Sequence, residues 1–289
     1  MNTTLVVLAA GFGSRYGGFK QLDAIGPNAH SIMDYSLFDA LYVGFTSLVL
    51  VVQESMIATL TERYITNRNW PVTFVIQEDD IFIDNKKHSR EKPWGTAHAL
   101  WCAKEAVNNS FVVINADDFY GRESFNLAFN YLQTQSDACA VLFPIEKTLS
   151  SNGTVNRAEA TITNGWLQAT VEREKIRKAN DTIVYLTPKG EEKQLAEHTL
   201  VSMNMWGLTP DIFDFIDTDI SDFIMEWNQN PNLEYQLPGV IDAMIQQNKI
   251  EVKAIATQSH WVGVTYKTDK EMVKTQLQEL HDSGIYTDL

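Results

Sequence analysis

The sequence has few of the features that mark secreted or membrane proteins. Its 289 residues include only two cysteines, Cys102 and Cys139, and neither lies in a spacing typical of a metal or redox site. The longest strongly apolar run, residues 48–52, is much shorter than the roughly 20 residues of a membrane span. No basic N-terminal region or cleavage site is present, so we expect a cytoplasmic protein without a signal peptide.

Positive charge is also scarce in this chain. There are 23 Lys and Arg against 37 Asp and Glu, which gives a formal net charge of −14. This balance argues against a nucleic-acid-binding surface, because such a surface needs clustered basic residues. The cations that do gather near the N-terminus are therefore a local exception.

Those cations belong to a glycine-rich segment that follows the first predicted strand, residues 5–8. Gly11 and Gly13 let the backbone approach a ligand closely and point N–H groups at phosphate oxygens. Arg15 and Lys20 come next, and both side chains are well suited to binding phosphate. Ligands of open α/β sheets bind at the carboxyl ends of the strands, so the segment predicts a polyphosphate site.

Two familiar phosphate loops do not match this segment. A dinucleotide-binding fingerprint would need a glycine at Tyr16, and a Walker A loop would need a lysine at Phe19. What remains, L-A-A-G-x-G-x-R with a downstream Lys, resembles the signature loop of the sugar-1-phosphate nucleotidyltransferases. The resemblance implies catalytic roles for Arg15 and Lys20, and nucleotide contacts for Ala10, Gly11 and Gly13.

Strand-like and helix-like segments alternate through the first half of the chain. The predicted strands are 5–8, 47–52, 72–76, 110–115 and 138–144, and the predicted helices are 31–41, 55–64, 96–107 and 125–134. This rhythm predicts a parallel sheet with right-handed crossovers and helices on both faces. From about residue 152, short strands and turns predict an antiparallel-rich lobe, followed by helices at 211–217, 238–248 and 270–281.

With the resemblance, this order implies an α/β protein with the three-layer α/β/α, Rossmann-like nucleotidyltransferase fold. We expect a mixed, mostly parallel sheet with an antiparallel-rich substrate lobe. One domain would span residues 1–289, with a nucleotide-binding half at 1–150, a sugar-phosphate-binding half at 151–265 and a C-terminal helix at 266–289.

An aspartate follows the strand predicted at residues 110–115. In the family, the Asp of a G-D-x segment at this place holds the metal, and it corresponds to Asp117, with Ala116 in place of the glycine. Mg²⁺ prefers one or two carboxylates together with substrate phosphates. The resemblance therefore implies Mg²⁺ as the cofactor and Asp117 as its ligand. A turn-forming aspartate is the alternative.

The nucleobase would be held by a strand-end glutamine and a glycine backbone, as in the family. Gln77 and Gly95 take those places. An amide can both donate to and accept from a pyrimidine edge. The charged insertion between them, residues 79–92, is expected to be a solvated loop.

In the second half, segment 170–175 resembles the family's V-x-E-K-P, whose Glu binds sugar hydroxyls and whose Lys binds the sugar phosphate. Glu172 keeps the acid, and Arg173 stands where Lys is expected. Asn204 replaces a glycine whose backbone contacts the sugar, so its side chain could reach the sugar ring.

One departure from the family concerns the metal. Segment 259–265 resembles W-x-D-x-G-T, but Gly263 stands where the family has its second metal carboxylate. Three explanations stay open: Mg²⁺ is held by Asp117 and phosphates alone, another acid such as Asp118 or Asp242 substitutes, or catalysis is lost.

The resemblance implies that a sugar 1-phosphate attacks a nucleoside triphosphate, with UTP or dTTP expected, to give an NDP-sugar and pyrophosphate. These two substrates would be its partners, with no nucleic acid and no membrane. A phosphocholine-type cytidylyltransferase is one alternative, because aromatic cages bind quaternary ammonium groups and Trp166, Tyr185, Trp206 and Trp261 lie in the substrate half. A catalytically silent nucleotide- or sugar-binding regulatory homologue is the other. The apolar segment 238–245 could serve a homo-oligomer contact.

Overall fold

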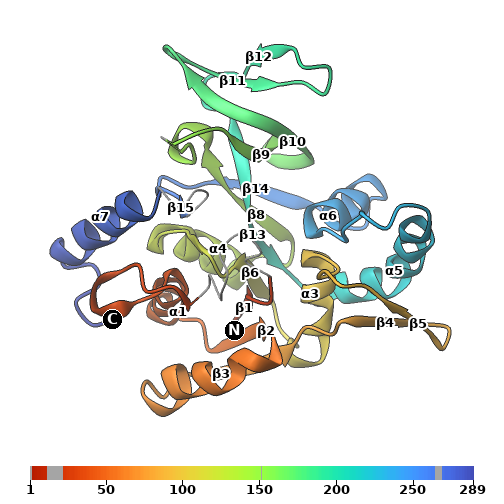
Figure 1. Cartoon of the computed structure of the whole chain (residues 1–289), viewed down its shortest axis with the longest axis horizontal. Helices are drawn as coiled ribbons and strands as arrows, with labels where there is room; N and C mark the ends of the chain where they lie inside the picture. Colours follow the sequence, from red (N-terminus) through yellow and green to blue (C-terminus); the bar gives the residue numbers. More distant parts are fainter. Residues whose placement is uncertain (1, 12–21, 151, 264–268) are drawn as a thin grey trace.

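A mixed sheet with helices on both faces forms the body of the protein, in a computed structural model that describes residues 2–11, 22–150, 152–263 and 269–289 (Figure 1). The strands are β1 (Thr4–Leu8), β2 (Ser47–Val52), β3 (Val72–Ile76), β4 (Asp80–Ile83), β5 (Lys86–Ser89), β6 (Phe111–Asn115), β7 (Asp118–Phe119), β8 (Ala138–Pro144), β9 (Val155–Thr163), β10 (Trp166–Ala179), β11 (Thr182–Leu186), β12 (Glu192–Gln194), β13 (Leu200–Leu208), β14 (Val252–Ala256) and β15 (Val262–Gly263). The α-helices are α1 (Ile32–Val43), α2 (Ile57–Leu60), α3 (Thr96–Cys102), α4 (Arg122–Thr134), α5 (Asp211–Gln229), α6 (Leu237–Gln246) and α7 (Asp269–Asp282).

The main sheet has the strand order β12-β11-β10-β14-β8-β13-β6-β1-β2-β3, and β9 pairs with β10 and β13. Neighbours are parallel from β6 to β3 and between β14 and β8, and the other pairs are antiparallel. Leu8 lies opposite both Val51 and Asn115, so the carboxyl ends of β1, β2 and β6 meet at one edge. The predicted fold class is confirmed, but the expectation of a mostly parallel sheet is wrong, since most strand pairs of this mixed sheet are antiparallel. The reason is that the consecutive strands β9 to β12 are joined by connections too short for parallel pairing, and β13 runs antiparallel between β6 and β8. The edge formed by β1, β2 and β6 is where such sheets bind ligands.

The central strands form because apolar side chains are buried on both of their faces. Successive side chains of a strand point to opposite faces. On β1, Leu5 and Val7 pack into one core cluster and Val6 into the other. On β6, Val112 and Ile114 join the first cluster, and Phe111 and Val113 join the second. Continuous apolar runs of this kind are typical of parallel strands covered by helices on both sides.

The insertion at residues 79–92 is more ordered than predicted. Instead of a solvated loop it contains a hairpin of β4 and β5. Asp84 and Asn85 connect the two strands with φ values of 49° and 62°. Two consecutive residues with positive φ make a turn whose twist matches that of the strands, and Asp and Asn tolerate this conformation. Lys87 pairs with Asp80 across the hairpin.

The second half adds a protruding lobe and a closing helix. β9 and β10 form a long antiparallel ribbon, which together with β11 and β12 makes up one end of the main sheet and protrudes at the top of Figure 1. The C-terminal segment after α7 is tied to α1, because Tyr286 donates a hydrogen bond of 2.6 Å to the buried carboxylate of Asp39. Burial raises the pKa of Asp39 to about 6, against the hydrogen bonds from Tyr286 and Arg122.

In the part of the chain that the structure describes, no helix combines the length and apolar character needed to cross a membrane. The predicted division of the domain at residues 150 and 265 stays a prediction.

Candidate functional site

The predicted phosphate loop begins at the edge where β1 ends. Ala10 is buried, and its carbonyl accepts a hydrogen bond of 2.9 Å from the Gln53 amide at the end of β2. The backbone N–H of Ala9 donates to the Val51 carbonyl at 2.8 Å. The chain therefore enters the loop along a path fixed by β2. Gly11 is exposed. Gly13, Arg15 and Lys20 lie outside the described residues.

Polar side chains form a connected series at the end of β6. The Trp206 indole N–H donates to Asn204 Oδ1 at 2.8 Å, the Asn204 amide donates to Asn115 Oδ1 at 2.7 Å, and the Asn115 amide donates to Asp118 Oδ2 at 2.9 Å. Every donor points the same way, toward the carboxylate of Asp118. Hydrogen bonds in such a series polarise one another, and they fix the orientation of the groups that they join. Tyr120 closes the cluster by donating to the Met203 carbonyl at 2.9 Å.

Asn204 has a backbone conformation that explains the family's glycine at this place. Its φ is 61°, in the left-handed region that glycine and asparagine adopt most readily. It lies in an irregular part of β13, where the register with β8 shifts between Ser202 and Trp206. The Asn204 side chain is engaged by Asn115 and Trp206. Its contact with a sugar stays a prediction.

Asp117 lies in the turn between β6 and β7, and Asp118 begins β7. β7 pairs with β15, so that Gly263 lies directly opposite Asp118. A Cβ atom at Gly263 would be 2.3 Å from the Trp261 indole and 3.1 Å from Asp118 Oδ1. The Trp261 ring therefore fills the place where the family has its second carboxylate.

Of the two acids that could substitute for that carboxylate, Asp118 is the one beside Gly263. Asp242, on α6, is engaged elsewhere. It accepts hydrogen bonds from the backbone N–H of Thr170 at 3.1 Å and from the Thr170 hydroxyl at 2.9 Å. Its role is to attach α6 to the β10 strand.

The donor set at the end of β6 fits Mg²⁺ chemically. Asp117 and Asp118 offer adjacent carboxylates, and Asn115 adds an amide oxygen. Hard oxygen donors of this kind suit Mg²⁺, which takes one or two carboxylates and completes its shell with phosphate and water. Within residues 2–11, 22–150, 152–263 and 269–289, no three His, Cys, Asp or Glu side chains gather as a site made wholly of protein ligands would require. A metal here would therefore depend on substrate oxygens.

Gln77 and Gly95 are brought together by α3. The Gln77 amide nitrogen lies 3.3 Å from Nδ1 of His98, on the first turns of that helix. Gly95 is the N-cap of α3, with φ 128° and ψ 179°. A Cβ atom there would be 2.3 Å from the Tyr235 carbonyl oxygen, so only glycine fits. His98 is not among the site residues predicted from the sequence, although its place three residues after Gly95 was a usable signal.

His98 should make stability depend on pH. Burial lowers the pKa of this fully buried imidazole to about 4, from 6.5 in the unfolded chain. Between these values the unfolded chain binds more protons, so the free energy of unfolding falls as the pH falls from 6.5 toward 4. We expect wild type to lose about 2 kcal/mol relative to His98→Asn between about pH 7 and about pH 4.5.

Urea denaturation of both proteins at each pH measures this difference. The raised pKa of Asp39 acts in the opposite direction, but it is present in both proteins and cancels in the comparison. If the free energies of unfolding of the two proteins change in parallel with pH, His98 takes up a proton in the folded state as readily as in the unfolded chain, and the expectation is wrong.

In the protruding lobe, Arg173 is already engaged. Its Nε donates to Glu159 Oε2 at 2.6 Å, and its guanidinium lies 4.8 Å from the centre of the Tyr185 ring. Glu172 is exposed as a residue, but its carboxyl group is partly shielded from water, and this desolvation raises the pKa of the carboxyl group. The positive charge of nearby Arg157 opposes this rise in pKa without cancelling it. Their contacts with a sugar phosphate stay predictions.

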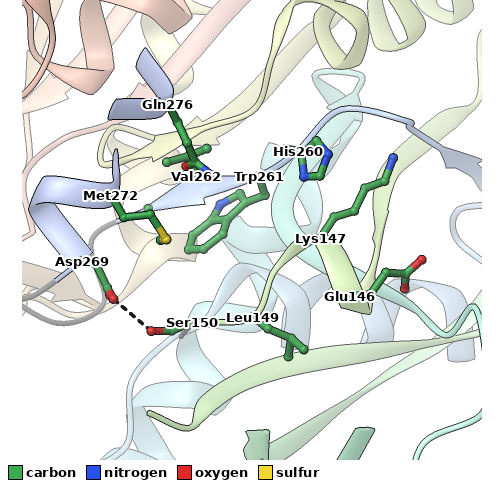
Figure 2. Close-up of a pocket in the computed structure, with 11 residues that line it drawn as sticks. Glu146, Lys147, Leu149, Ser150, His260, Trp261, Val262, Asp269, Met272 and Gln276 are labelled. Carbon is green, nitrogen blue, oxygen red and sulfur yellow. Dashed lines mark hydrogen bonds between the residues drawn. The ribbon is translucent and has the colours of Figure 1, made fainter. Parts of the chain in front are cut away.

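A pocket of about 160 Å³ lies between the segment after β8, the strand β15 and helix α7 (Figure 2). Figure 2 shows the Trp261 indole at its centre and the hydrogen bond of 2.9 Å from Ser150 to Asp269 at one side. The pocket reaches Gly263, but none of the described residues that the sequence predicted as site residues lines it. It adjoins the cluster at the end of β6 without containing it.

This arrangement, with a loop after β1 and carboxylates after β6 at the same sheet edge, is that of enzymes that bind nucleotides at the carboxyl ends of parallel strands. A family model described as "Nucleotidyl transferase" matches residues 5–264, so the chain belongs to the nucleotidyl transferase family. The predicted family and enzyme class are thereby confirmed.

Solved structures of other proteins have the same fold. A putative glucose-1-phosphate thymidylyltransferase from Bacillus anthracis aligns with a TM-score of 0.65 and 13% identity, over 96% of each chain. A UDP-glucose pyrophosphorylase from Acinetobacter baumannii aligns with a TM-score of 0.62 and 17% identity, over 97% of this chain and 93% of that one. An inositol-1-phosphate CTP transferase from T. maritima aligns with a TM-score of 0.62 and 11% identity, over 96% of each chain. No curated protein matched the sequence.

Proposed function

We propose that the protein couples a sugar 1-phosphate to UTP or dTTP, giving an NDP-sugar and pyrophosphate. The observation that carries the proposal is the oriented cluster of Asn115, Asp118 and Asn204, which lies at the sheet edge where the loop after β1 begins. Structural neighbours include a UTP-bound enzyme and one complexed with UDP-glucose. UTP is a substrate of this class of reaction, and UDP-glucose is a product.

The reaction needs no protein nucleophile. An oxygen of the sugar phosphate attacks the α-phosphorus of the triphosphate, and the bond to the β-phosphate oxygen breaks to release pyrophosphate. Catalysis then consists of positioning and charge stabilisation. Arg15 would neutralise the leaving phosphates, Lys20 would stabilise the α-phosphoryl group, and Glu172 would hold sugar hydroxyls. Mg²⁺, held by Asp117, would supply further neutralisation of the triphosphate charge.

The preference for a pyrimidine rests on Gln77. Its amide carries both a donor and an acceptor, as the edge of uracil or thymine requires. The neighbouring His98 is neutral near pH 7, because burial holds its pKa at about 4. An imidazole that accepts from the Gln77 amide nitrogen would fix which end of the amide faces the base.

The phosphocholine alternative finds less support. Lys253, Arg173 and Arg157 lie over the rings of Trp166, Tyr185 and Trp261, and Trp206 is fully buried. Each of these three rings therefore already has a cation of the protein over one face, where a quaternary ammonium group could otherwise bind.

Pyrophosphate release measures the proposed reaction directly. Each of UTP, dTTP, CTP, ATP and GTP is combined with glucose 1-phosphate, inositol 1-phosphate or phosphocholine. We expect the highest initial rate with glucose 1-phosphate and either UTP or dTTP. A clear preference for a purine triphosphate or for phosphocholine would contradict the proposal, and no release with any pair would favour a silent binding protein.

Asp117→Asn should raise the Mg²⁺ concentration needed for half-maximal rate and lower the maximal rate. The change removes a full negative charge but keeps the shape of the side chain, and Mg²⁺ prefers carboxylate oxygens. Initial rates of both proteins across a Mg²⁺ titration give the answer. Asp211→Asn, in the first turn of α5, is a matched control. Superimposable curves for wild type and Asp117→Asn would make Asp117 a turn residue only.

A further inference from the structure

Arg157, on β9, is a buried cation that the proposed reaction has not yet used. It is 8% exposed. Its terminal nitrogens donate to the backbone carbonyls of Thr148 at 2.6 Å and Asn156 at 2.8 Å. Its Nε is buried without a hydrogen-bond partner. Its guanidinium carbon lies 4.6 Å from the centre of the Trp261 ring. Backbone and indole thus hold the guanidinium in one orientation.

No carboxylate among the described residues forms an ion pair with Arg157, although two act on it from a distance. Asp118 reaches it from the nucleotide half, and Glu172 from the protruding lobe. Buried charges are normally paired, because an unpaired buried ion costs several kcal/mol. A guanidinium with an unused buried N–H has the geometry to accept an oxyanion ligand. Arg157 therefore lies between the two halves of the protein, and no carboxylate of the described residues forms an ion pair with it.

A second buried donor lies beside it. The indole N–H of Trp261 also has no hydrogen-bond partner. Trp261 is the residue whose ring covers Gly263, where the family places a carboxylate. At the place where the resemblance puts an acid, this chain therefore presents the Trp261 indole beside Asp118, and the Arg157 guanidinium packs against the same indole.

The residue that the sequence assigned to the sugar phosphate has other partners. Arg173 is paired with Glu159 and lies over Tyr185. Arg157 lies directly opposite Arg173 in the β9–β10 register. Unlike Arg173, it has no acid of the described residues in contact. Of these two arginines, which lie opposite each other on β9 and β10, Arg157 is therefore the better candidate for binding an anion.

We propose that Arg157 binds the phosphate group of the attacking sugar 1-phosphate, with the Trp261 ring packed against the guanidinium. This proposal rests on the nucleotidyltransferase function proposed above and names a residue for its acceptor subsite. The guanidinium N–H groups that the Thr148 and Asn156 carbonyls do not use would donate to phosphate oxygens and so orient the nucleophile toward the α-phosphorus. The phosphate in turn pairs the buried charge.

Arg157→Gln, Arg157→Lys and the control Arg177→Gln test the assignment. Arg177 lies on the neighbouring strand β10 and forms an exposed pair with Glu192. Loss of charged hydrogen bonds should raise the KM for glucose 1-phosphate in Arg157→Gln by about tenfold or more, with the KM for UTP changed less than about twofold. Arg157→Lys keeps the charge but loses the planar guanidinium, so its KM for glucose 1-phosphate should lie between those of wild type and Arg157→Gln. Arg177→Gln should match wild type.

A binding measurement separates this proposal from the proposed function. Glucose 1-phosphate and inorganic phosphate should each raise the thermal midpoint of wild type, glucose should not, and both effects should be lost in Arg157→Gln. If Arg157→Gln does not fold, Arg157→Lys carries the test through a weaker phosphate effect. Equal protection of wild type and both variants, or equal rises in both KM values, would overturn the role of Arg157. Absence of turnover by wild type would overturn the proposed function and leave the phosphate measurement decisive for Arg157.

Discussion

Replacing Lys20 or Arg15 by alanine is expected to reduce kcat/KM by a factor of about 100 or more, which corresponds to about 3 kcal/mol of lost transition-state stabilisation. Each substitution removes one positive charge from the loop that follows β1. In a transfer without a protein nucleophile, charge stabilisation by such groups is the largest contribution that the protein makes. The free energy of unfolding should change little, because neither side chain is apolar.

The measurement is the rate of pyrophosphate release, together with a urea denaturation curve for each variant. Lys104→Ala is a suitable control, since Lys104 forms an exposed surface pair with Asp217. Pairs of this kind contribute little to stability and lie on the surface of the protein. If Lys20→Ala or Arg15→Ala retains nearly normal kcat/KM, the loop after β1 does not hold the reacting phosphates.

The largest effect on stability is expected from Gly95→Ala. The φ of 128° and ψ of 179° at Gly95 are accessible to glycine almost alone, and a Cβ would lie 2.3 Å from a backbone oxygen of Tyr235. That oxygen accepts a hydrogen bond from Ala97 in the first turn of α3, so it cannot move without breaking the start of the helix. We expect a loss of about 3 kcal/mol or more in the free energy of unfolding.

Gly239→Ala provides the matched control in α6. Gly239 is exposed, has no positive φ, and nothing lies within 4 Å of a Cβ built there. Alanine should leave stability unchanged or raise it by up to about 1 kcal/mol. Urea denaturation of the two variants compares them directly. A Gly95→Ala protein as stable as Gly239→Ala would mean that the segment between β5 and α3 adopts another conformation.

The core of the fold could be predicted from the sequence because its determinants are local. The strands β1, β2 and β6 follow from continuous apolar runs, and the helix α1 follows from apolar residues at helical spacing. The hairpin at residues 80–89 could not be predicted in this way. Its strands have only four residues each and β5 is polar, so its clearest signal was the Asp84–Asn85 pair that forms the turn.

The candidate site was predictable only where residues follow a strand end directly. Asp117 and Ala10 could be placed at one edge of the sheet because parallel strands bring their carboxyl ends together there, and their roles stay predictions. Arg157 was missed because its environment is assembled from distant parts of the chain. Thr148 precedes β9, Trp261 lies beside β15, and Asp118 begins β7. Only the folded chain brings these groups around the guanidinium.

The fate of the acceptor phosphate tests the central claim most directly. Glucose 1-phosphate labelled with ¹⁸O in its phosphate is incubated with the wild-type enzyme, Mg²⁺ and UTP or dTTP, and the products are analysed by mass spectrometry. We predict an NDP-glucose that carries the label in the phosphate joined to the sugar, together with unlabelled pyrophosphate. Label in the released pyrophosphate, or hydrolysis of the triphosphate without formation of NDP-glucose, would contradict attack by the sugar phosphate on the α-phosphorus.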